Sequence, residues 1–110
     1  QLFGRADYST AIGEFEAAIA MQPSRATYHV FLAQCILLLP KREPDHLYRA
    51  VECLKRAIQI NPRKGDPFHL LGVALVELDR KDEATFALRK ALQLGTSHRK
   101  ETRRLLETIT

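Results

Sequence analysis

The chain offers few side chains that could carry out catalysis, and their spacing matches no familiar catalytic arrangement. Its three serines, Ser9, Ser24 and Ser97, each stand at the start of a stretch with a helical pattern, where a serine hydroxyl commonly caps the helix. The four histidines show neither His-x-x-x-His spacing nor a Cys-x-x-Cys companion, which are the usual marks of a metal site. No glycine-rich phosphate loop is present. We therefore predict no enzyme activity, no metal site and no cofactor.

The two cysteines, Cys35 and Cys53, fall inside helical patterns. Buried free thiols are the simplest interpretation, because cysteine packs as a small hydrophobic residue. The sequence also lacks an Asn-x-Ser/Thr glycosylation site, so we expect a reducing, cytoplasmic location. No apolar run approaches the roughly 20 residues that a membrane-spanning helix needs.

The charge balance is basic, with a net charge of +4 and an isoelectric point near 9.3. Much of the excess lies in the final segment, which contains His98, Arg99, Lys100, Arg103 and Arg104. A solvated polar face explains this cluster most simply, with an acidic protein partner and a nucleic acid as alternatives. The 110 residues, 45% of them hydrophobic, suffice for one domain with a continuous core.

The strongest signal is a row of residue types that occurs three times with helical spacing. Its copies are Tyr8, Ala11, Ile12, Phe15, Ala18, Ile19 and Pro23; Leu47, Ala50, Val51, Leu54, Ala57, Ile58 and Pro62; and Lys81, Ala84, Thr85, Leu88, Ala91, Leu92 and Thr96. A second row begins six residues after each Pro or Thr: His29, Leu32, Ala33 and Ile36; Phe68, Leu71, Gly72 and Leu75; and Thr102, Leu105, Leu106 and Ile109. The two rows predict a repeated pair of helices and an all-α fold.

These rows resemble the tetratricopeptide repeat, a helix pair of 34 residues in which small residues alternate with large ones. Thr96 follows Pro62 by 34 residues and Pro62 follows Pro23 by 39, so the middle unit carries five extra residues, at positions 40–44. This insert is either a tolerated loop or a second contact point that uses Lys41, Arg42 and Glu43. The resemblance implies a right-handed superhelix of antiparallel helix hairpins. The small side chains should permit close helix contacts: Ala33, Ala50, Ala57, Gly72, Ala84 and Ala91.

The repeat pattern predicts a single domain over residues 1–110. It divides into a partial repeat at 1–23, the repeat with the insert at 24–62, a repeat at 63–96 and a capping helix at 97–110. We expect Leu2 to end a helix that begins before the chain, so that the chain is a fragment of a larger protein. Helices are expected over about 9–21, 25–39, 66–78 and 82–94, with Ser24 and Asp66 capping two of them. Another helix, which either Glu43 or Asp45 caps, is expected to end near Ile60. His29 takes the place of Phe68, so it should pack in the core.

The resemblance implies a superhelix in which the first helix of each pair lines the inner surface. On these helices, the residues that neighbour the core positions should point into the groove. In the middle unit these are Thr27, Val30, Phe31, Gln34, Leu37 and Leu38; in the last they are Asp66, His69, Leu70, Val73, Val76 and Glu77. This groove is mostly apolar, with a polar rim of Gln34, Asp66, His69 and Glu77. The resemblance therefore implies a scaffold that binds an apolar or amphipathic protein segment, unless another helix of the protein covers the groove.

A device known in the family is a clamp of Lys, Arg and Asn side chains for the acidic carboxyl terminus of chaperone peptides. In this sequence Asp66, Leu70 and Phe31 stand at those positions, and a shift by one unit brings Val30 and Gln34 there instead. Binding of an acidic tail is therefore not expected. The alternatives are a self-association module of a multidomain protein, such as a bacterial signalling or chaperone-cofactor protein, which would make a homo-oligomer, and, less favoured, an RNA-binding helical repeat.

Overall fold

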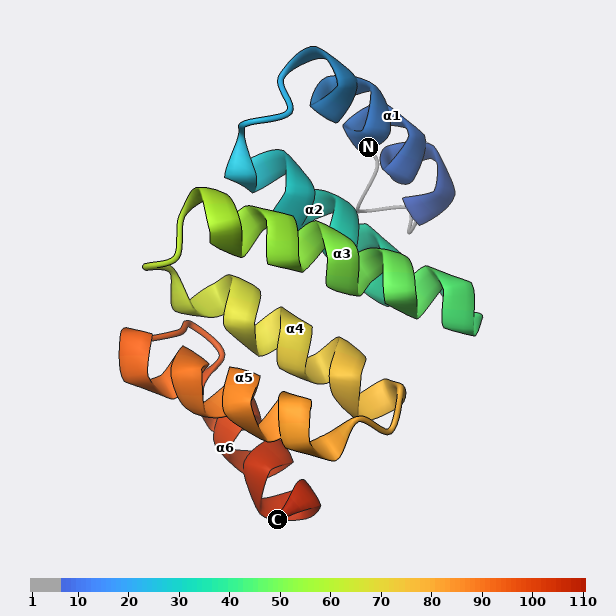
Figure 1. Ribbon diagram of the computed structural model, residues 1–110. Coiled ribbons are helices and arrows are strands. Elements are labelled where there is room, and N and C mark those ends of the chain that lie inside the picture. Colours follow the sequence, from blue (N-terminus) through green and yellow to red (C-terminus); the bar gives the residue numbers. More distant parts are fainter. Residues whose placement is uncertain (1–6) are drawn as a thin grey trace.

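The computed structural model describes residues 7–110 as six α-helices joined by short turns (Figure 1). Their bounds are α1 (Tyr8–Met21), α2 (Ala26–Leu37), α3 (Pro44–Ile60), α4 (Gly65–Glu77), α5 (Lys81–Leu94) and α6 (Arg99–Ile109). No strand occurs over this range. The predicted all-α fold of stacked helix hairpins is thus confirmed. The helix expected to end at Leu2 lies outside the described residues.

The helices stack in the order of the sequence, from α1 at one end to α6 at the other (Figure 1). Each helix packs against the next one, and α4 also contacts both α2 and α6. The helices α2, α4 and α6 therefore form one layer of the stack. We call the side of α2 and α4 that carries the twelve predicted groove positions the inner face.

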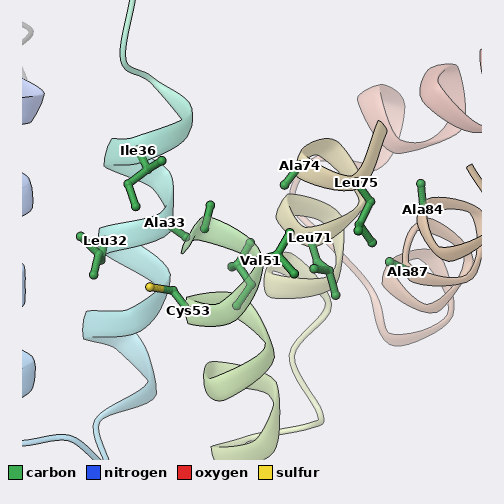
Figure 2. Close-up of a cluster of buried hydrophobic side chains, with 12 residues drawn as sticks. Leu32, Ala33, Ile36, Val51, Cys53, Leu71, Ala74, Leu75, Ala84 and Ala87 are labelled. Carbon is green, nitrogen blue, oxygen red and sulfur yellow. The ribbon is translucent and has the colours of Figure 1, made fainter. Parts of the chain in front are cut away.

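One continuous core runs through the stack (Figure 2). The cluster includes Leu32 and Ile36 of α2 and Val51 of α3, and it continues through Leu71 of α4 to Ala87 of α5. The predicted small residues lie at the tightest contacts: Ala33, Ala50, Ala57, Ala84 and Ala91 are each at most 1% exposed. Close packing of this kind explains why α2, α3 and α5 present small residues to neighbouring helices.

The termini of the helices differ in detail from the predicted caps. None of the three serines caps a helix: Asp7 caps α1 by accepting from Thr10 N at 3.3 Å, and Arg25 occupies the cap position of α2 without a side-chain hydrogen bond. The prediction that Asp66 caps α4 was wrong as well, because that helix begins one residue earlier, at Gly65. Gly95, with a φ of 95°, ends α5 as its lack of a side chain allows.

Candidate functional site

The twelve predicted groove residues lie along α2 and α4, but they differ in how far they reach solvent. Phe31 is 40% exposed and Leu38 is 51% exposed. Leu37, Leu70 and Val76 are half-buried and pack against the core cluster. The other members are exposed (Thr27, Glu77), half-buried (Val30, Gln34, Asp66, Val73) or buried (His69). The accessible apolar surface of the inner face is therefore concentrated on α2.

Phe31 is held from one side by the adjoining helix. Its ring centroid lies 5.5 Å from that of Phe15 in α1, with the two rings tilted by 45°. Aromatic pairs prefer such tilted arrangements, so Phe15 limits the rotamers that Phe31 can adopt. The result is a fixed aromatic side chain that still exposes two-fifths of its surface.

A cavity of about 440 Å³ opens at one end of the inner face, between the starts of α2 and α4 and the turn that follows α5. Its lining combines predicted groove residues with residues from the start of α4 and from two turns: Thr27, Val30, Asn61, Lys64, Gly65, Asp66, Pro67, Gly95, Thr96 and Ser97. Three of the twelve predicted residues, namely Thr27, Val30 and Asp66, are thus brought together. The seven others come from helix ends and turns, which repeat spacing alone does not place.

The Asp66 carboxylate is used inside the molecule rather than offered to a partner. It accepts hydrogen bonds from Thr96 Oγ1 at 2.6 Å and from Ser97 N and Ser97 Oγ, both at 2.9 Å. Burial raises the pKa of this carboxyl, but these three hydrogen bonds and the nearby charge of His98 outweigh burial and hold the pKa below its usual value. Asp66 therefore holds the turn before α6 against α4 through these hydrogen bonds.

His69 is likewise turned toward the C-terminal helix. It is 3% exposed, its Nδ1 lies 2.7 Å from Thr102 Oγ1, and its ring stacks on that of His98 with centroids 4.6 Å apart. Burial, followed by the proximity of His98, lowers the pKa of the His69 imidazole and keeps it neutral. His69 is thus a docking residue for α6 and is withdrawn from the polar rim that we expected.

Glu77, the last residue of α4, is bound by Arg42 of the insert. Its Oε1 lies 2.8 Å from Nε of Arg42, and the guanidinium also donates to the carbonyls of Leu37 and Leu39 at 2.9 and 3.0 Å. Of the predicted polar rim, Gln34 is the member without a hydrogen bond to another described side chain. The inner face is consequently less polar than the sequence indicated.

A second apolar depression, which the repeat pattern did not predict, lies on the opposite side of the stack. It has a volume of about 410 Å³ and is lined by Lys55, Phe68, Leu71, Leu75, Asp82, Glu83, Phe86 and Ala87. Phe86 is 69% exposed. The signal available in the sequence was an aromatic residue in a helix at a position outside both repeated rows.

The two cysteines are buried and free, as predicted. Burial raises the pKa of both thiols, so they remain protonated and poorly nucleophilic near neutral pH. The core position of His29 is also confirmed, since it is 8% exposed and its Nε2 donates to the Pro23 carbonyl at 2.9 Å. Among the described helices none has the length and apolar character needed to cross a membrane.

Comparison with known proteins identifies the repeat. A family model described as the tetratricopeptide repeat matches residues 66–94, which cover the described α4 and α5. The chain is similar in structure to MamA (TM-score 0.84, 20% identity, covering 96% of this chain and 58% of that one). It is also similar to the TPR2B domain of yeast Sti1 in a complex with pHsp70 (0.85, 17%, 97% and 86%).

A third similar structure is the Yersinia enterocolitica type III secretion chaperone SycD in complex with a peptide of the translocator YopD (TM-score 0.84, 14% identity, covering 97% of this chain and 82% of that one). The present chain thus spans little more than half the length of MamA and most of the other two chains. No curated protein matches the sequence significantly. At these identities the likeness concerns the fold.

Proposed function

We propose that the chain is a protein-interaction module whose inner face holds an apolar segment of a partner, because residues 66–94 match the tetratricopeptide repeat and the fold resembles that of such domains. The proposal includes a scaffold role without enzyme activity and a cytoplasmic location, in keeping with the protonated, buried thiols. The units at 1–23, 24–62 and 63–96 and the capping helix at 97–110 remain our proposed division of the domain.

The observation that carries this proposal is the exposure of Phe31 in α2, 40%, and of Leu38 directly after that helix, 51%. Val30, on the same helix, lines the cavity of about 440 Å³ at the end of the inner face. An exposed apolar patch beside a cavity is typical of interaction sites, and fixed aromatic side chains commonly supply much of the binding energy. Phe31, steadied by Phe15, fits that role.

The chemistry of the inner face favours an apolar or amphipathic partner segment. Asp66, His69 and Glu77 are engaged by Ser97, Thr102 and Arg42, so few polar groups are left to recognise a charged peptide. The related domains of SycD and Sti1 were determined with a peptide and with pHsp70, which supports peptide binding as the general mode. The acid clamp positions are not filled here by Lys, Arg and Asn, so we do not propose an acidic carboxyl-terminal ligand.

The proposal is tested with peptides selected from a random displayed library and titrated against the purified domain by fluorescence anisotropy. We expect Phe31→Asp combined with Leu38→Asp to weaken binding by at least about tenfold, since both side chains are truncated from the apolar patch and replaced by charges. Both residues are exposed, so circular dichroism should show unchanged helicity.

The matched control is Phe86→Asp, which places the same charge at an exposed aromatic position on the opposite side of the stack. It should leave peptide affinity unchanged. Equal affinity of the wild type and the Phe31/Leu38 double variant would refute the assignment of the inner face.

Self-association is the second candidate function, and the depression around Phe86 is the observation that favours it. Its rim carries Lys55 on one side and Asp82 and Glu83 on the other, so two copies related by a two-fold axis could pair opposite charges around Phe86. Light scattering that shows a monomer at all concentrations would eliminate this candidate. A dimer abolished by Phe86→Asp, but not by the double variant, would place self-association on that side.

A further inference from the structure

Three side chains with metal-ligating atoms converge where α6 meets α4. His69, His98 and Glu101 each place one such atom within 4.8 Å of the other two. His98 and Glu101 lie three residues apart at the start of α6, with His98 Nδ1 3.5 Å from Glu101 Oε1, while His69 comes from α4. His69 is far from His98 and Glu101 in the sequence, and only the fold brings the three side chains together. For this reason the sequence predicted no metal site.

The hydrogen bonds around Thr102 fix the tautomer of His69. The Thr102 hydroxyl donates its single proton to the His98 carbonyl at 2.7 Å, so at its 2.7 Å contact with His69 Nδ1 it must accept. The proton of the neutral His69 ring is therefore on Nδ1, and the lone pair is on Nε2. Histidines that bind metals usually have this arrangement, in which the non-ligating nitrogen donates to an oxygen and orients the ring.

We propose that His69 Nε2, His98 and Glu101 form a zinc-binding site that joins the C-terminal helix to α4. Two imidazole nitrogens and one carboxylate oxygen are a donor set that Zn²⁺ prefers, with water as a fourth ligand. The Asp66 carboxylate, which interacts electrostatically with both histidines, adds to the negative potential there. This inference concerns the contact between α4 and α6 and does not depend on the proposed peptide groove.

Binding requires a rearrangement of one side chain. In the stacked pair the two imidazole planes are nearly parallel, at 13°, so their in-plane lone pairs do not converge on one point. His98 occupies the cap position of α6 and its side chain is 34% exposed, so its ring is able to turn out of the stack toward the lone pair of His69. The Glu101 side chain is 66% exposed and equally free to approach.

The test is calorimetric titration of the whole chain with zinc chloride after removal of any affinity tag, together with melting curves with and without the ion. We expect one Zn²⁺ per chain and a higher melting temperature, because an ion that binds only the folded state stabilises it. Magnesium, which prefers oxygen ligands, should have no effect. With Co²⁺ as the probe, the visible spectrum should show tetrahedral d–d bands without the strong thiolate absorption of a cysteine site.

His98→Ala and Glu101→Gln should each weaken zinc binding by at least about tenfold. His69 is left unchanged because it is buried. The controls are His46→Ala, which removes a histidine from α3, and Glu107→Gln, which removes an exposed carboxylate further along α6; both should bind zinc as the wild type does. Absence of stoichiometric binding, or equal affinity in the wild type and both ligand variants, would overturn the site.

Discussion

Gly65 and Gly13 differ in how much space surrounds them, and this difference can be tested. A Cβ atom at Gly65 would overlap the backbone carbonyl of Gly95, whereas a Cβ atom at Gly13 would meet nothing within 4 Å. Backbone cannot move aside as the end of a side chain can. Gly65→Ala should therefore lower the free energy of unfolding by about 1–3 kcal/mol, and Gly13→Ala should raise it by about 0.5–1 kcal/mol, since alanine is the better helix former.

Urea unfolding of the two variants checks this pair. Equal stabilities would mean that the start of α4 does not approach the end of α5 as closely as described. The close approach matters to the function, because Gly65 and Gly95 both line the cavity at the end of the inner face.

Asp66 should make the stability depend on acid pH. Its pKa is lowered in the folded chain, so the unfolded state binds the proton more readily and the folded state is favoured above the unfolded pKa of about 3.9. That contribution is fully present near pH 6 and is lost as the pH falls through the folded pKa. Melting temperatures measured from pH 6 to pH 2.5 should show the wild type well above Asp66→Asn at pH 6 and the two curves converging in acid. If the difference in melting temperature between the wild type and Asp66→Asn did not change with pH, the stabilising role of the Asp66 carboxylate would be contradicted.

The residues of the core could be predicted from sequence, but the partners of the polar groove residues could not. His29 was correctly placed in the core because it shares a slot with Phe68 in the repeated row. The same reasoning put Asp66 and His69 on an open rim. In the structure they bind Ser97 and Thr102, which lie 31 and 33 residues further along the chain. Helical periodicity does not predict such contacts, because they depend on how the C-terminal segment packs against α4.

At the scale of the elements, the insert between α2 and α3 is tied down by Arg42. Its guanidinium reaches the carbonyls at the end of α2 and Glu77 of α4 at the same time, which satisfies carbonyls that a helix end would otherwise leave unpaired. We expect Arg42→Ala to lower the free energy of unfolding by about 1–2 kcal/mol. Arg42→Lys should restore little of it, because an ammonium group lacks the planar fork that holds several acceptors.

Lys41→Ala is the control for this prediction. Lys41 is the neighbouring basic residue of the insert and its side chain is 88% exposed, so its removal should change stability by less than about 0.5 kcal/mol. If Arg42→Ala and Lys41→Ala had the same melting temperature, the insert would be the tolerated loop that was one of the two interpretations of the sequence.

The positions of the elements followed from the sequence more closely than their ends did. All six helices occur where the rows and the Pro residues indicated, because helical periodicity and helix-stopping residues are local properties. The ends moved by one or two residues where tertiary contacts decided them. The second helix, expected to reach Leu39, stops at Leu37, and Arg42 binds the carbonyls there.

At the scale of the whole molecule, the stack has two unlike sides. On the inner face Phe31 and Leu38 are exposed, and the cavity opens at the end where α2 and α4 begin. At that same end the turn before α6 binds Asp66, and α6 binds His69. The opposite side offers the depression around Phe86. The sequence predicted the first of these and not the second, because the repeat resemblance assigns a role to the inner layer alone.

A methyl and amide NMR footprint of a selected apolar peptide on the folded domain decides whether the inner face is the binding surface. We expect chemical-shift changes centred on Val30, Phe31, Leu38 and Val73, with Leu71, Leu75 and Phe86 unchanged. Changes centred on Leu75 and Phe86, with α2 unaffected, would contradict this expectation.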